Sequence, residues 1–173
     1  MKNIARAVAA MSSAVMLISC AFGPDYGKAS ASLPDVAPDK GRIVFFRKWH
    51  FQSSVICARI KIDGQRVGCL SNAAVMQIDH SPGDVKIALD RPEAPGECIV
   101  PLKVDGGRTY YIEVDGNGGH GGGEAFGAVG LLLSSLKPDA DQYCGGPWCA
   151  AIRDKADALP KLQDLTLETA DAS

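Results

Sequence analysis

The fold is decided by a hairpin signal in residues 55–69, which read VICARIKIDGQRVGC. Up to Ile62, apolar side chains alternate with polar ones, and a period of two indicates a half-buried strand. Asp63-Gly64 follows at once, and this dipeptide is the commonest signal for a two-residue type I′ turn. The stretch therefore predicts two antiparallel strands joined by a tight turn.

The register of this hairpin also makes a prediction about two cysteines. With a two-residue loop, Val67 would lie opposite Ile60 and Cys69 opposite Ala58, so that the apolar faces match. Cys57 would then point outward, and Cys69 would point into the core.

Outward from the hairpin, short apolar or alternating stretches recur between Gly, Pro and Asp turn signals. We expect strands at residues 42–48, 74–79, 84–89, 98–104, 108–114 and 148–152. Pro101 cannot donate to a ladder, which places its strand at a sheet edge or at a bulge. Strands at this spacing predict a mainly β fold, an antiparallel β-sandwich or barrel-like domain.

The end of the chain predicts a short helix. Asp154 is a residue type favoured at the N-cap, and Pro160 prevents a long helix. Leu159, Leu162 and Leu165 would face inward. The single domain would then span residues 41–168, with a glycine-rich loop at 116–123 and a disordered tail at 169–173.

The first residues have the layout of a bacterial export signal. Lys2 and Arg6 precede an apolar run that is shorter than the roughly 20 residues needed to span a bilayer. The run ends in Leu17-Ile18-Ser19-Cys20, which resembles the lipobox of bacterial lipoproteins. The resemblance implies removal of residues 1–19 and a lipid, with acyl chains such as palmitate, on Cys20. Because residue 21 is alanine rather than aspartate, the resemblance also implies that the protein is anchored in the outer membrane and faces the periplasm.

The mature chain would begin with a flexible linker over residues 20–40, which hold three prolines and no apolar period. Removal of residues 1–19 takes away two of the 18 basic residues and none of the 20 acidic ones, leaving a net charge of −4. Nucleic-acid binding needs a basic face, so we predict no nucleic-acid partner.

Six cysteines are present, and if Cys20 carries lipid, five remain in an oxidising compartment. An odd number cannot all pair within one chain. Cys144 and Cys149 enclose a Gly-Gly-Pro turn, so a local disulfide is the expected pair. The second candidate pair is Cys69 with Cys98. Cys57 would then be the cysteine left unpaired.

No established catalytic or metal-binding motif occurs, neither H-E-x-x-H, nor zinc-spaced cysteines, nor G-x-S-x-G. His120 and Glu124 could ligate a metal, and Cys57 could be a nucleophile if the fold brought a histidine to it. Cys144 and Cys149 could act in redox chemistry, but their four-residue spacing is not that of C-x-x-C. We expect His120 to be a solvated loop residue and the cysteines to be unreactive. The sequence therefore predicts a protein that is not an enzyme and binds no cofactor and no metal.

An apolar segment, Ala125–Leu136, is too short to cross a membrane. We expect a strand or short helix laid over an open end of the sandwich. The alternative is a hydrophobic flap that contacts the bilayer or a partner protein.

The order of the motifs resembles that in a family, the bacterial lipoproteins carrying domain of unknown function 2846. The resemblance covers about residues 39–115, and weakly 158–162, and rests on Arg42–Arg47 (RIVFFR), Ile62-Asp63-Gly64, Val67-Gly68, Ser81-Pro82-Gly83 and Gly107–Tyr111. It implies a small β-sandwich on a lipid anchor, with no established activity. We therefore expect a non-catalytic binding or structural module of the cell envelope, with a protein or glycan partner. The alternative is a thiol- or disulfide-active or metal-binding periplasmic protein.

Overall fold

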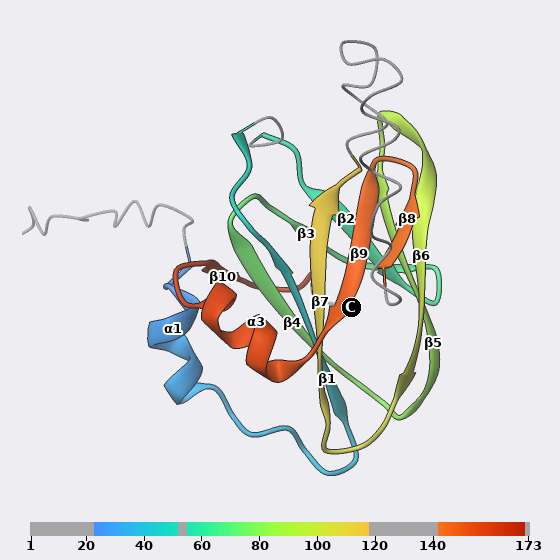
Figure 1. Cartoon of the computed structure of the whole chain (residues 1–173). Coiled ribbons are helices and arrows are strands. Elements are labelled where there is room, and N and C mark those ends of the chain that lie inside the picture. Colours follow the sequence, from blue (N-terminus) through green and yellow to red (C-terminus); the bar gives the residue numbers. More distant parts are fainter. Residues whose placement is uncertain (1–22, 52–54, 118–141, 172–173) are drawn as a thin grey trace, which may run out of the picture.

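The computed structural model describes residues 23–51, 55–117 and 142–171, and within them ten strands form two facing sheets (Figure 1). The six-stranded sheet contains, in spatial order, β10 (Thr166–Glu168), β4 (Ala74–His80), β1 (Gly41–Arg47), β7 (Thr109–Gly116), β9 (Trp148–Arg153) and β8 (Gln142–Gly145). The four-stranded sheet contains β3 (Gln65–Leu70), β2 (Ala58–Ile62), β5 (Gly83–Arg91) and β6 (Ala94–Val104). The predicted mainly β fold is confirmed, as a sandwich that does not close into a barrel.

The two sheets differ in strand direction. The four-stranded sheet is antiparallel throughout, whereas β1 pairs with β7 in parallel and β10 pairs with β4 in parallel. Pro101 lies on β6, an edge strand of its sheet, as its missing N–H requires. The main core fills the space between the sheets, where Ile43 and Phe45 of β1 face Ile60 and Ile87 of the other sheet.

Helices cover the outer face of the six-stranded sheet, so that the molecule has a third layer (Figure 1). They are α1 (Tyr26–Ala29), the 3-10 helix η1 (Ser30–Ser32) and α3 (Lys155–Leu162). Tyr26 and Leu162 pack there against Val44 and Phe46 of β1. The predicted C-terminal helix is confirmed, with Asp154 at the N-cap position and Pro160 inside it. Of its expected inward residues, Leu162 and Leu165 are buried and Leu159 is partly buried.

The flexible linker predicted over residues 20–40 is wrong for residues 24–32, which the structure packs against the domain. The Pro24 carbonyl accepts a hydrogen bond from Leu167 N (2.9 Å), and Tyr26 N donates to the Leu165 carbonyl (2.7 Å). Tyr26 is buried, and its hydroxyl accepts a hydrogen bond from Gln77. A lone tyrosine shows no period in sequence, because its partners come from distant parts of the chain.

The disordered tail predicted at 169–173 is likewise wrong up to Asp171. Asp171 N donates to the Val67 carbonyl (2.9 Å), and the Asp171 carboxylate pairs with Arg66. The last described residues therefore extend along β3.

The disulfide predicted between Cys69 and Cys98 is wrong, and a β-bulge explains why. The turn forms as expected, since Asp63 and Gly64 both have positive φ. The register then shifts, so that Ile60 pairs with Gly68 and Arg59 with Cys69. A shift of one residue turns a side chain to the other face of a strand. Cys69 therefore shares the outer face with Cys57, to which it is bonded with a Cα–Cα distance of 5.5 Å.

The local disulfide predicted between Cys144 and Cys149 is present, with the two residues directly opposite each other in the β8–β9 hairpin. The unpaired cysteine within the described residues is Cys98, not Cys57.

Candidate functional site

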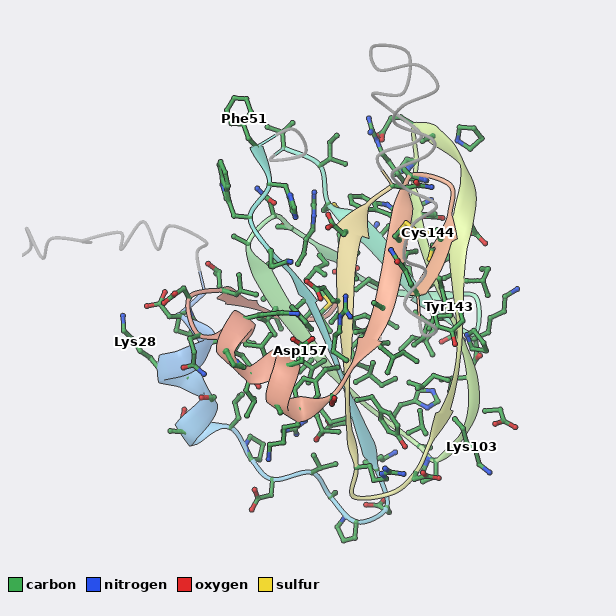
Figure 2. All side chains as sticks on the ribbon, viewed as in Figure 1. Lys28, Phe51, Lys103, Tyr143, Cys144 and Asp157 are labelled. Carbon is green, nitrogen blue, oxygen red and sulfur yellow. A yellow bond between two sulfur atoms is a disulfide. The ribbon has the colours of Figure 1, made fainter. Side chains whose placement is uncertain are left out.

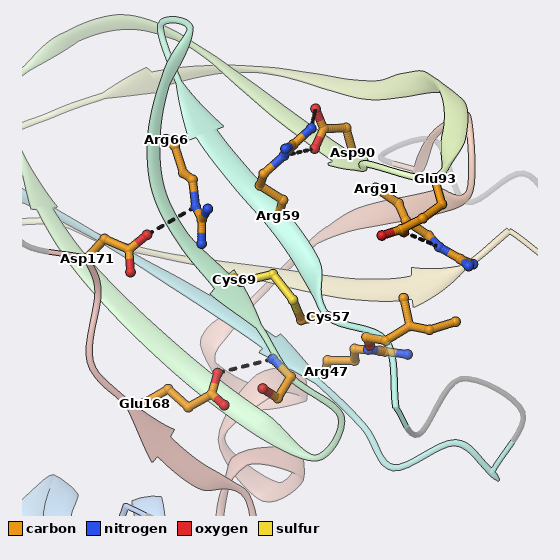
Figure 3. The surroundings of a disulfide bond; sticks show 12 residues. Arg47, Cys57, Arg59, Arg66, Cys69, Asp90, Arg91, Glu93, Glu168 and Asp171 are labelled. Atoms are coloured by element: carbon orange, nitrogen blue, oxygen red, sulfur yellow. Dashed lines mark hydrogen bonds and ion pairs between the residues drawn. A yellow bond between two sulfur atoms is a disulfide. The ribbon is translucent and has the colours of Figure 1, made fainter. Parts of the chain in front are cut away.

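A pocket of about 460 Å³ lies on the outer face of the four-stranded sheet, over the Cys57–Cys69 disulfide (Figure 3). Its lining comes from β2, β3, the connection that precedes β2, and the end of β5 with the turn that follows it. Three arginines, Arg59, Arg66 and Arg91, are arranged around the disulfide, whereas among the described residues Glu93 is the one acidic residue of the lining. The lining itself therefore holds more cationic than anionic side chains, although each of the three arginines is paired with a carboxylate.

Arg59 is held in place by a carboxylate beneath it. Its Nη2 donates to Asp90 Oδ2 at 2.8 Å and its Nε donates to Oδ1, a bidentate pair. Lys61 Nζ lies 2.6 Å from Asp90 Oδ2, and the Asp90 side chain is only 8% exposed. The hydrogen bond from Arg59, with help from Lys61, lowers the pKa of Asp90 to about 2. Asp90 therefore stays ionised at neutral pH and fixes the direction of the Arg59 guanidinium.

Arg66 and Arg91 are held more weakly. Arg66 Nε lies 3.1 Å from Asp171 Oδ2, with both side chains about half exposed, and Arg91 Nε lies 3.1 Å from Glu93 Oε2, a carboxylate that is 67% exposed. Exposed ion pairs of this kind contribute about 0–1 kcal/mol. Both guanidinium groups can therefore exchange their present carboxylate for an anion of a ligand at small cost.

The remaining lining is apolar. Val55, Ile56 and Pro92 border the pocket together with the disulfide. Cys57 and Cys69 are bonded to each other, so neither is a free thiol in this structure. The arrangement suits an anion that carries an apolar group beside it, since guanidinium forks match carboxylate and phosphate oxygens.

The free thiol lies elsewhere, inside the sandwich. Cys98 is fully buried, its Sγ donates to the Tyr143 carbonyl (3.1 Å), and burial raises its pKa to about 11. The reactive form of cysteine is the thiolate, so this thiol is poorly suited to attack a substrate at neutral pH.

The structure separates the other residues that the sequence singled out. His50 Nε2 lies 3.2 Å from Asp115 Oδ1, and His80 Nδ1 contacts the Ser81 carbonyl.

Among residues 23–51, 55–117 and 142–171, no group of three or more His, Cys, Asp or Glu could hold a metal ion. No helix in this part of the chain is long and apolar enough to cross a membrane. The lipidation candidate Cys20, the pair His120 and Glu124, and Ala125–Leu136 lie outside the described residues.

Sequence reasoning missed a buried arginine behind the pocket. Arg47 is fully buried at the end of β1, with its guanidinium carbon 4.7 Å from the centre of the Trp148 ring. Its Nη1 donates to the Ile56 carbonyl, and Trp148 Nε1 donates to the Asp90 carbonyl (3.0 Å). The signal was present, because Arg47 follows Ile43 and Phe45 at intervals of two and so shares their inward face.

The class that the fold and the pocket define is a helix-covered, open β-sandwich with an arginine-lined surface pocket. No family model, no curated protein and no solved structure matches the chain.

Proposed function

We propose that this chain is a lipid-anchored, non-catalytic binding module of the bacterial cell envelope, which holds an anionic group of an envelope component in the arginine pocket. The observation that carries the proposal is the pairing in that pocket. One arginine is fixed by a buried carboxylate, and two others are held by exposed carboxylates that a ligand can displace. The ligand group would be a phosphate or a carboxylate on an envelope glycan or protein.

The location in the envelope is supported by the sequence. Residues 1–20 have the layout of a lipoprotein signal ending in Leu17-Ile18-Ser19-Cys20, and Ala21 favours the outer membrane, facing the periplasm. The motif order resembles that of bacterial lipoproteins carrying domain of unknown function 2846. Two disulfides within the described residues are in keeping with an oxidising compartment.

The alternative, a thiol- or disulfide-active protein, has less support. Cys98, the thiol of the described residues, is buried with a raised pKa, which disfavours thiolate chemistry. Metal capture by His120 and Glu124 rests on residues outside the described ranges, so no geometry favours it.

The anchor is tested by producing the full chain in a Gram-negative bacterium and measuring its intact mass. The expected product begins at Cys20 and carries a diacylglyceryl group and an amide-linked acyl chain. Cys20→Ala should leave the precursor unprocessed. A wild-type chain cleaved elsewhere, without lipid, would contradict the anchor.

Binding is tested on the mature lipoprotein in nonionic detergent by calorimetric titration with inorganic phosphate and with citrate. Hydrogen bonds to charged groups contribute about 1.5–3 kcal/mol each, so replacing both exchangeable arginines, Arg66→Gln with Arg91→Gln, should weaken binding by about a hundredfold or more. Arg108→Gln is the matched control, because Arg108 forms a similar exposed pair with Asp105 and does not line the pocket. Equal affinities in the double variant and the control would contradict the proposed site.

A further inference from the structure

The largest exposed apolar side chains of the described residues all lie in one connection. Trp49 is 62% exposed, Phe51 is 78% exposed and Val55 is 94% exposed, and all three belong to the segment between β1 and β2. The Trp49 and Phe51 rings lie 6.3 Å apart. Figure 2 shows Phe51 at the outer end of this connection, pointing away from the sandwich. Single exposed apolar residues are ordinary, whereas a group of them marks a contact surface.

The start of the domain lies near this connection. Asp25 bridges to Thr166, Thr166 pairs with Ala74, and Ala74 pairs with Arg47 at the end of β1. Neighbouring strands are about 4.8 Å apart, so Asp25 is about 14 Å from Arg47 across the sheet. In Figure 1, α1 and β10 lie on the left of the view, and the β1–β2 connection rises above them on the same side.

The anchor point cannot be far from this edge of the domain. Gly23 is the first described residue, and Pro24 is already bonded to Leu167. Cys20 is three residues before Gly23, and a chain of that length spans at most about 11 Å. A bilayer that holds a lipid on Cys20 is therefore within reach of the β1–β2 connection. A flexible linker that ran to Lys40 would have allowed the domain to lie far from the bilayer.

We propose that Trp49 and Phe51 insert into the bilayer that holds the lipidated Cys20, and that they form a second membrane contact that orients the domain. This inference rests on the lipid anchor of the proposed function. Tryptophan and phenylalanine suit the boundary between headgroups and acyl chains, where Trp combines an apolar ring with a hydrogen-bond donor. Lys48, beside them, is already paired with Glu113 at 2.8 Å, so the contact is apolar rather than electrostatic.

The test uses the mature full-length lipoprotein in vesicles of phosphatidylethanolamine and phosphatidylglycerol whose acyl chains are brominated, with unbrominated vesicles as reference. Bromine quenches tryptophan emission only at close range. The chain has two tryptophans, and Trp148 is buried in the sandwich. We expect emission from Trp49 to be lost in brominated vesicles and the loss to persist at high salt. Trp49→Phe should abolish the loss, and Phe51→Ser should weaken it.

The outcomes separate this inference from the anchor. The same sample is weighed by mass spectrometry to establish whether Cys20 is acylated. An acylated protein whose Trp49 emission is equal in both vesicles overturns the second contact and leaves the anchor standing. A chain without lipid overturns both.

Discussion

Replacing Glu113 with glutamine removes the negative charge on which α3 is docked. Glu113 is on β7, with its side chain only 6% exposed, and its oxygens lie 2.8 Å from Lys48 Nζ, 2.8 Å from Arg153 Nε and 3.2 Å from Lys161 Nζ. Burial raises the pKa of Glu113, but the hydrogen bonds from Lys48, Lys161 and Arg153 outweigh it and bring the pKa to about 2, against an ordinary value of 4.5.

That pKa difference sets the size and the pH range of the effect. One pKa unit corresponds to about 1.4 kcal/mol, so the ionised Glu113 contributes about 3 kcal/mol to the free energy of unfolding. Because the folded pKa is the lower one, the contribution is complete above the unfolded value of 4.5 and is lost as the pH falls from about 5 to about 2. Glu113→Gln should therefore destabilise the protein by about 3 kcal/mol at pH 7 and by little at pH 2.

Urea unfolding of the mature lipoprotein in nonionic detergent, followed by tryptophan fluorescence between pH 2 and pH 7, measures this difference. Glu97→Gln is the control, because Glu97 is 42% exposed and, among the described residues, pairs with Lys61. The control should change stability by no more than about 1 kcal/mol. A Glu113→Gln effect no larger than that of the control, or one that does not vary with pH, would refute the reasoning.

Three further predictions concern the cysteines and one glycine. Replacing Cys57 and Cys69 together by serine should cost about 3 kcal/mol, because the bond closes a loop with a sequence separation of 12; equal urea midpoints for variant and wild type would contradict this. Cys98 should resist Ellman's reagent in the native protein and react fully in urea, so rapid native labelling would show that its burial is misjudged. Gly145→Ala should destabilise by about 1–3 kcal/mol, since a Cβ there would lie 2.3 Å from the Glu97 carbonyl oxygen; an unchanged melting temperature would argue against this packing.

The β2–β3 hairpin shows how far the sequence predicts this fold. The turn at Asp63-Gly64 follows from local chemistry, since both residues need positive φ. The bulge does not, because it depends on Gly68 facing the core, where a Cβ would lie 2.5 Å from Met76 Sδ of the other sheet. Alternation instead predicts that Val67 faces inward. In the structure Val67 is the extra residue of the bulge and packs, partly buried, against the core, and the register shift turns Cys69 to the outer face, where it bonds to Cys57.

The pocket was unpredictable for a related reason. Arg59 and Arg66 are separated in sequence by a turn, and Arg66 and Arg91 by β4 and most of β5, and each arginine alone is an ordinary outward-facing charge. Only the pairing of β2 with both β3 and β5 brings them around one disulfide. Tyr26 is the same case in the helix layer, because its burial depends on β4 and α3.

The buried pair behind the pocket explains how such a site can exist before a ligand arrives. Arg47 donates to the carbonyl of Ile56, which lines the pocket, and Trp148 donates to the carbonyl of Asp90, whose carboxylate holds Arg59. Two walls of the pocket are thus tied through their main chain to residues of the sandwich interior. The fixed wall and the displaceable arginines at its rim let the pocket bind an anionic ligand without a further entropic cost of ordering the site, because the site is already ordered in the folded protein.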